Sequence, residues 1–165
     1  MKNINVVLLE PEIPQNTGNI SRTCAATDCA LHLIKPLGFT ITDSRLKRAG
    51  LDYWHDLDLN YYENWSEFEK QHGGKNLYYF STKARLCYTE VSYTDEVWLV
   101  FGKETAGLPE KLLRENEKRC LRIPMLGDTR SLNLSNSAAI AVYEVLRQRG
   151  FKGLNQKGKL FEDKA

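Results

Sequence analysis

The chain of 165 residues has no apolar run that approaches the roughly 20 residues of a membrane-spanning helix. Its first residues also lack the long apolar core and small-residue cleavage site of a signal peptide. We therefore expect a cytoplasmic protein without membrane contact. The formal net charge of only +2 permits a nucleic acid partner but does not require one.

Cysteine is scarce, and the four cysteines form no C-x-x-C pair: Cys24, Cys29, Cys87 and Cys120. They lie among apolar residues, which indicates buried free thiols without disulfides. Cys24, Cys29 and His32 suggest three zinc ligands, but no paired fourth ligand follows at a zinc-finger spacing. We expect no metal. The phosphate-binding G-x-x-x-x-G-K-[ST] loop and the dinucleotide fingerprint G-x-G-x-x-G are absent too, which argues against a nucleotide-binding oxidoreductase.

Apolar runs alternate with helical patterns along most of the chain. Strands are predicted at 5–9, 30–35, 57–62, 76–81, 96–101 and 120–123, and helices from 15, 43, 64, 109 and 136, with an irregular stretch at 84–94. This alternation predicts an α/β fold with a mostly parallel sheet and helices on both faces. The length suits a single domain, which we place at 1–152, followed by a loose basic tail at 153–165.

The stretch 120–150 contains a strand that Pro124 terminates, a polar loop and a helix. In the loop, Leu132 and Leu134 are the predicted buried anchors, and Ser135 or Asn136 is the predicted helix cap. The buried stripe of the helix is expected at Ala138, Ala141, Val142, Val145 and Leu146, and the helix is expected to end at Gly150. A strand, a polar loop and a helix N-terminus can bind a small molecule, although an ordinary β–α connection has the same pattern.

Three other segments carry polar residues that suit binding. Asn16, Asn19 and Arg22 recur every three residues at a helix start, where they can form a site or merely cap the helix and face solvent. The loop 102–109 contains glycines that would let the backbone approach a ligand. A basic segment at 43–50, beside Tyr53 and Trp54, can hold phosphates and stack bases, or can be a solvated helix over a core aromatic.

Three stretches together resemble the motifs of the SPOUT superfamily of RNA methyltransferases: NTGNISR at 16–22, FGKETAGLP at 101–109 and IPM…RSLNLSNS at 123–137. The resemblance covers nearly all of residues 1–150. EPEIPQNTGN at 10–19 and RLKRAGLDY at 45–53 are similar to the TrmL/YibK-type branch, which methylates the ribose 2′-oxygen at the wobble position of tRNA. The resemblance does not separate cytidine from modified uridine at that position.

The resemblance implies a deep trefoil knot in the C-terminal part, a feature too rare to expect from composition or periodicity. It also implies S-adenosylmethionine as the methyl donor, S-adenosylhomocysteine as the product, and no metal. The implied partners are tRNA and a second copy of the chain. The matching cofactor-binding positions are Phe80, Gly102, Glu104, Ile123, Met125, Ser131, Leu132 and Ser137, and the RNA-binding positions are Arg45, Lys47 and Arg48.

Arg22 matches the catalytic arginine of the superfamily. A guanidinium is a poor base, so phosphate anchoring and charge stabilisation stand beside proton abstraction as its role. Asn16 is expected to fix Arg22 or the ribose. Tyr143 matches a tyrosine near the family's active site, although an amphipathic core or interface residue fits its position equally. Two further alternatives stay open, methylation of another RNA ribose and a non-catalytic RNA-binding module on the same scaffold.

Overall fold

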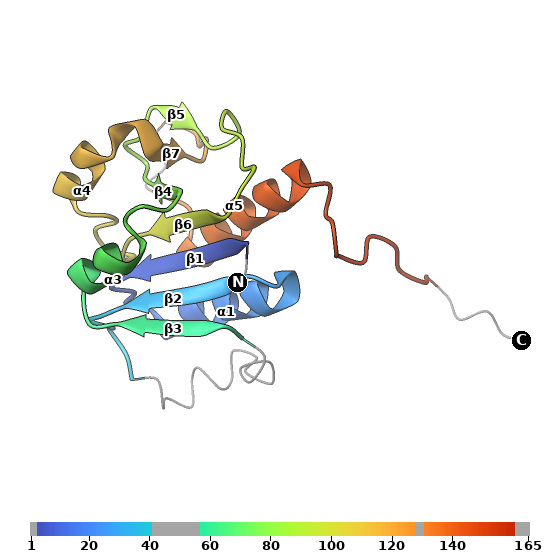
Figure 1. Cartoon of the computed structure of the whole chain (residues 1–165), viewed down its shortest axis with the longest axis horizontal. Helices are drawn as coiled ribbons and strands as arrows, with labels where there is room; N and C mark the ends of the chain where they lie inside the picture. The colour runs from blue at the N-terminus through green and yellow to red at the C-terminus, as the bar shows by residue number, and fades with distance from the viewer. Residues whose placement is uncertain (1–2, 41–56, 128–130, 161–165) are drawn as a thin grey trace, which may run out of the picture.

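The structure is a computed structural model that describes residues 3–40, 57–127 and 131–160 (Figure 1). One sheet of seven parallel strands has the order β3-β2-β1-β6-β4-β7-β5. The strands are β1 Ile4–Leu9, β2 Ala30–Ile34, β3 Leu59–Tyr62, β4 Leu77–Phe80, β5 Leu86–Cys87, β6 Val97–Phe101 and β7 Cys120–Arg122. The helices are α1 Pro14–Thr27, α3 Trp65–His72, α4 Glu110–Glu115 and α5 Leu134–Gln148, with the 3-10 helix η2 at Glu117–Arg119.

The central strand β1 is buried along its whole length, because its side chains point alternately into two cores. Val6 and Leu8 belong to the core that α1 and α5 complete, whereas Val7 and Leu9 belong to the core with Phe68 of α3. The helices therefore cover both faces of the sheet. The predicted α/β fold with a mostly parallel sheet is confirmed, and so is the buried stripe of the last helix.

Several local predictions need correction. The stretch 84–94 is not wholly irregular, because β5 pairs with β7 there. The helix α5 begins at Leu134, earlier than predicted, since Asn133 rather than Ser135 or Asn136 is its N-cap. Leu134 is consequently a half-buried helix residue, and Leu132 is half-buried as well. The predicted basic helix at 43–50 lies outside the described residues.

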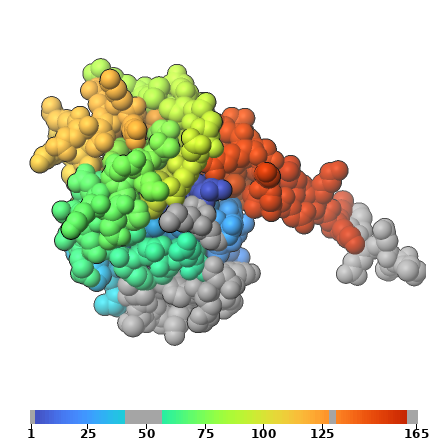
Figure 2. Space-filling view, viewed as in Figure 1, coloured from blue at the N-terminus to red at the C-terminus, as the bar shows by residue number. Residues whose placement is uncertain are grey.

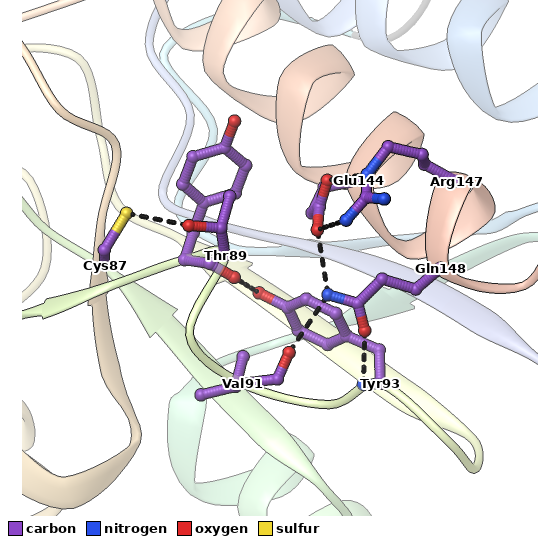
Figure 3. Close-up of polar contacts among 8 residues, drawn as sticks. Cys87, Thr89, Val91, Tyr93, Glu144, Arg147 and Gln148 are labelled. Carbon is purple, nitrogen blue, oxygen red and sulfur yellow. Dashed lines mark hydrogen bonds and ion pairs between the residues drawn. The ribbon is translucent and has the colours of Figure 1, made fainter.

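The C-terminal half of α5 is fastened to the connection between β5 and β6 (Figure 3). The Gln148 side chain accepts a hydrogen bond from the backbone N–H of Tyr93 at 3.1 Å and donates one to the Val91 carbonyl at 3.0 Å. Its amide also donates to the buried Glu144 carboxylate at 2.8 Å. Because Tyr93 itself is buried, this connection and α5 pack as one unit. Beyond α5 the chain projects from the body, and most of 153–160 is exposed (Figure 2).

The four cysteines are free, and three of them are buried while Cys87 is half-buried. His32 is hydrogen-bonded through Nδ1 to the Tyr62 hydroxyl and through Nε2 to the Asn5 side chain, so its imidazole has protein partners on both nitrogens. Within the described ranges, no group of three or more His, Cys, Asp or Glu side chains is arranged to hold a metal ion. No helix in these ranges is long and apolar enough to cross a membrane.

Candidate active site

A cavity of about 710 Å³ opens beyond the carboxyl ends of β4, β6 and β7. These strands are parallel neighbours, so the loops that follow them meet at the same edge of the sheet. All eight predicted cofactor-binding residues line this cavity: Phe80, Gly102, Glu104, Ile123, Met125, Ser131, Leu132 and Ser137. Asn16 lines it too, and so do residues that the sequence reasoning had not singled out, such as Lys83, Leu108 and Leu113. The structure thus brings residues from four segments to one cavity.

The apolar part of the cavity wall is built around a pair of stacked rings. The rings of Phe80 and Phe101 have centroids 4.7 Å apart and an interplanar angle of 19°. Both residues are buried, Phe80 at the end of β4 and Phe101 at the end of β6. Ile123 and Met125 extend the apolar lining on the β7 side. An apolar wall with a few polar groups is typical of a site for an organic ligand.

Gly102 is required by the protein's own backbone. A Cβ atom at this position would lie 2.1 Å from the carbonyl carbon of Gly107 and 2.3 Å from the nitrogen of Leu108. The loop after β6 folds back so tightly because Gly107 adopts φ +70° and donates its N–H to the Lys103 carbonyl at 2.8 Å. The sequence predicted that Gly102 leaves room for a ligand. The position of a Cβ atom is filled by the far side of the same loop, while Gly102 still lines the cavity.

Glu104 connects the β6 loop to the start of α1. Its carboxylate accepts hydrogen bonds from the backbone N–H groups of Glu12 at 2.8 Å and Ile13 at 3.2 Å. It also accepts one from Nδ2 of Asn16 at 2.9 Å. Ile13 is the N-cap residue of α1 and has no side-chain oxygen, so a glutamate from another loop supplies the carboxylate at this helix start. Asn16 therefore does not cap α1, contrary to one of the two alternatives.

Asn16 links Glu104 to the last helix, α5, through a second hydrogen bond. It is only 5% exposed, and its Oδ1 accepts a hydrogen bond from Nδ2 of Asn133 at 2.9 Å. The Asn133 Oδ1 in turn accepts from the backbone N–H of Ser135 at 2.9 Å and of Asn136 at 3.4 Å. The side chains Glu104, Asn16 and Asn133 thus join the β6 loop, α1 and α5. Asn133 is absent from the predicted site residues, although an asparagine before an apolar helical pattern is a recognisable cap signal.

Two predicted catalytic residues lie outside the cavity lining. Arg22 is exposed on α1 and makes no hydrogen bond or ion pair with any residue of the described ranges. Tyr143 is 49% exposed on α5. The predicted RNA-binding residues Arg45, Lys47 and Arg48 lie outside the described part of the chain. The structure therefore brings Asn16 to the cavity with the cofactor-binding set and leaves Arg22 and Tyr143 on the surface.

Comparison with known proteins gives a family match over residues 3–143, to the SpoU rRNA Methylase family. A curated relative from Saccharophagus degradans is 52% identical over 150 residues, covers 90% of this chain and 97% of its own length, and is named tRNA (cytidine(34)-2'-O)-methyltransferase. A solved structure described as "Structural insights into the 2-OH methylation of C/U34 on tRNA" has a TM-score of 0.84 and 41% identity. It covers 90% of this chain and 97% of that one.

A second solved structure is informative about the cavity. It is the AdoMet-bound rRNA methyltransferase from Sinorhizobium meliloti, with a TM-score of 0.77 and 26% identity. The similarity covers 87% of this chain and 56% of that chain. That protein holds S-adenosylmethionine on a fold that this chain shares.

Proposed function

Because the chain belongs to the SpoU rRNA methylase family, we propose that it transfers a methyl group from S-adenosylmethionine to the ribose 2′-oxygen of nucleotide 34 in tRNA. Nucleotide 34 is the wobble position, and both cytidine and modified uridine are candidate substrates. The observation that carries this proposal is the cavity, where every cofactor position implied by the family motifs lies beside Asn16. The curated relative and the C/U34 structure support the choice of substrate.

The cavity suits S-adenosylmethionine in size and in chemistry. Its volume of about 710 Å³ lies within the range that organic ligands occupy in proteins. The buried rings of Phe80 and Phe101 and the side chain of Ile123 provide an apolar wall for an adenine ring. Ser131, Ser137 and the backbone of the β6 loop offer polar groups for the ribose and the amino acid part. We propose these residues as the cofactor-binding set.

Bound S-adenosylmethionine would supply an electrophilic methyl group on a sulfonium that leaves as a neutral thioether. The chain's own residues have two tasks. They must hold the ribose oxygen in line with the methyl group, and they must help its hydroxyl to lose a proton. Glu104, Asn16 and Asn133 serve the first task, because their hydrogen bonds fix the start of α1 against the cavity wall. Asn16 belongs to α1 and lines the cavity together with Glu104 and Asn133.

Arg22 serves the RNA side of the reaction in this proposal. It lies on α1 outside the cavity lining, and its guanidinium is exposed, as a group that meets RNA rather than cofactor must be. A guanidinium can hold a phosphate in a bidentate arrangement and stabilise negative charge that develops on the ribose oxygen. We therefore assign Arg22 to anchoring and charge stabilisation rather than to proton abstraction.

The partners in this proposal are tRNA and a second copy of the chain, in the cytoplasm. A single domain with a net charge of +2 offers little basic surface for tRNA, so contacts from two subunits would strengthen binding. The helix α5 has apolar groups outside its buried stripe, namely the half-buried Ile140 and the half-exposed Tyr143. On this proposal Tyr143 contacts the second copy or the RNA. Light scattering at micromolar concentration should give twice the monomer mass, and a monomer would contradict the dimer.

We also propose that the C-terminal part is threaded as a trefoil knot. β7 lies between β4 and β5 in the sheet, although β6 and α4 intervene in the chain. The strands β4 and β5 therefore flank β7, and Gln148 and Arg149 bind the connection between β5 and β6. This arrangement supports passage of the chain through that connection. A crystal structure that traces residues 123–134 outside the connection would contradict the knot.

The proposed activity is tested by single-turnover methylation of tRNA transcripts with labelled S-adenosylmethionine, followed by mass spectrometry of the nucleosides. We expect one 2′-O-methyl group at nucleotide 34. A matched transcript with 2′-deoxycytidine at that position lacks only the accepting oxygen and should stay unlabelled. Label at another nucleotide would favour a different RNA site. Binding of tRNA without any transfer, under conditions where S-adenosylmethionine binds, would favour a non-catalytic module.

Cofactor binding has its own measurement. Calorimetry in the presence of a chelator should show S-adenosylmethionine or S-adenosylhomocysteine binding without added metal, since the cavity wall comes from one chain and the reaction needs no Lewis acid. The absence of binding at high ligand concentration would count against the cofactor assignment. The two experiments together separate failure of the cofactor site from failure of the RNA substrate.

A further inference from the structure

The strand β1 ends in a residue with an unusual backbone conformation. Glu10 follows Leu9 directly and adopts φ +52°, a left-handed region that non-glycine residues rarely occupy. In the described part of the chain two other non-glycine residues have positive φ: Asp28 is the C-cap of α1, and Phe151 lies two residues beyond the C-cap of α5 and donates its N–H to the Leu146 carbonyl. Left-handed residues are common at helix ends. Glu10 has no such explanation, and non-glycine residues in strained conformations cluster at functional sites.

The Glu10 side chain forms an ion pair with Lys103, beyond the carboxyl ends of β1 and β6. Its Oε2 lies 2.9 Å from Nζ of Lys103, and each side chain is only about one-third exposed, 34% for Glu10 and 35% for Lys103. Lys103 lines the cavity and directly precedes Glu104. The hydrogen bond and the charge of Glu10 raise the pKa of Lys103 above its ordinary value, so the ammonium stays protonated. The pair therefore joins the end of β1 to the cavity wall.

Hydrogen bonds in both directions continue this junction. The backbone N–H of Thr105 donates to the Glu12 carboxylate at 3.1 Å, while the backbone N–H of Glu12 donates to the Glu104 carboxylate at 2.8 Å. The segments 10–13 and 103–105 are thus joined by hydrogen bonds from the backbone of each segment to a side chain of the other. Since α1 begins at Pro14, the same junction sets where α1 starts relative to the cavity.

We propose that the Glu10–Lys103 ion pair is a positioning clasp for methyl transfer. It fixes the β1–α1 connection against the β6 loop, and thereby holds α1, with Arg22, in register with the cavity. This inference rests on the proposed function. Neither residue touches the reacting atoms, so both are positioning residues. Because a displacement of about 1 Å can lower the rate about a hundredfold, the clasp matters more for turnover than for cofactor binding.

The test uses Glu10→Gln, which keeps the side-chain shape and weakens the ion pair. Single-turnover methylation should slow about tenfold or more, while the S-adenosylmethionine dissociation constant should change by less than about threefold. The double variant Glu10→Lys with Lys103→Glu restores the pair with opposite charges and should recover most of the rate. Glu63→Gln is the matched control, because it weakens the 2.6 Å pair of Lys35 and Glu63, which directly follow β2 and β3, and should leave both quantities unchanged.

A second variant separates the ion pair from the backbone strain. Glu10→Gly relieves the left-handed conformation and removes the carboxylate, so it should be as slow as Glu10→Gln. If Glu10→Gly transferred methyl groups at the normal rate, the ion pair would not be needed for turnover. A slow rate in Glu10→Gln would then reflect backbone strain, and the clasp would be overturned. A loss of melting temperature in Glu10→Gln with an unchanged rate would overturn it too, since that is the signature of a merely structural pair.

Amide hydrogen exchange provides a readout that does not depend on activity. In Glu10→Gln the N–H groups of Glu12, Ile13 and Thr105 should exchange faster, because they donate into the junction. The control Glu63→Gln should leave them protected. Unchanged protection in Glu10→Gln would refute the clasp even if the wild-type chain methylated a different RNA. If the wild-type chain transferred no methyl group at all, the proposed function would fail, while this exchange measurement would still test the clasp.

Discussion

Replacing Asn133 by Ala removes two sets of hydrogen bonds at once. The side chain caps α5 through its Oδ1 and donates from Nδ2 to the buried Asn16. Loss of an asparagine cap costs about 1 kcal/mol. Leaving the buried Asn16 carbonyl oxygen without a donor costs about 1–3 kcal/mol more. The free energy of unfolding should therefore fall by about 2–4 kcal/mol in Asn133→Ala, by the sum of these two contributions.

Asn133→Asp separates the two contributions. An aspartate keeps the cap but places an oxygen where the donor was. Asn16 cannot rotate its amide to compensate, because its Nδ2 already donates to Glu104 and reversal would place an oxygen against that carboxylate. We therefore expect Asn133→Asp to retain the helix cap and still loosen the contact between α1 and α5. The affinity for S-adenosylmethionine should fall in both Asn133→Asp and Asn133→Ala, since both substitutions disturb the cavity wall.

Urea unfolding followed by tryptophan fluorescence measures the stability, and calorimetry measures the affinity. The matched control is Asn64→Ala, because Asn64 caps α3 by accepting from the backbone N–H of Glu67 at 3.0 Å and does not line the cavity. It should lose about 1 kcal/mol and leave S-adenosylmethionine binding unchanged. If Asn133→Ala cost no more than Asn64→Ala, the contact with Asn16 would have no energetic weight, and the reasoning from the three-residue connection would be wrong.

Gly102→Val should destabilise the β6 loop and weaken S-adenosylmethionine binding at least tenfold by calorimetry, because its Cβ would collide with Gly107, whereas Gly74→Val has open space and should be harmless. Arg22→Ala should nearly abolish single-turnover methylation with little change in cofactor affinity, and Arg22→Lys should restore little activity. Near-normal methyl transfer in Arg22→Ala would show that Arg22 is only a solvated surface charge. The pKa of His32 is lowered to about 4, mainly by burial, so the neutral form is favoured in the folded state. Stability should be highest above pH 6.5 and fall by about 3 kcal/mol as pH drops from 6.5 to 4, with a shallower fall in His32→Gln by urea unfolding at several pH values.

The elements that the sequence predicted well are those with a local signal. β6 is an unbroken apolar run, β1 is apolar apart from Asn5, and the last helix has a clear apolar stripe. β5 has no such signal, because two residues, Leu86 and Cys87, become a strand through pairing with β7. The strand order is likewise set by long-range packing and is invisible in local periodicity.

The cavity lining was predictable because parallel strands collect their following loops at one edge, and the family motifs indicate which loops matter. The hydrogen-bond roles within it were not predictable. Glu104 was expected among the cofactor-binding residues, and it lies in the wall, but its carboxylate is occupied by the start of α1. Likewise, the constraint on Gly102 comes from its own loop. The role of Glu104 depends on groups that meet across about 90 residues of chain, as in its contact with Asn16 at a separation of 88, whereas the role of Gly102 depends on how its own loop folds back.

The connection from β1 to α1 departs from two local rules, the one on positive φ and the one on helix capping. Glu10 is left-handed without being glycine, and Ile13 is an N-cap residue without a capping oxygen. Both departures are compensated from the β6 loop, by Lys103 and Glu104. A helix whose end is completed by another loop depends on that loop for its own order. Because Lys103 and Glu104 both line the cavity, we expect a ligand bound there to affect the start of α1 and, through it, the placement of Arg22.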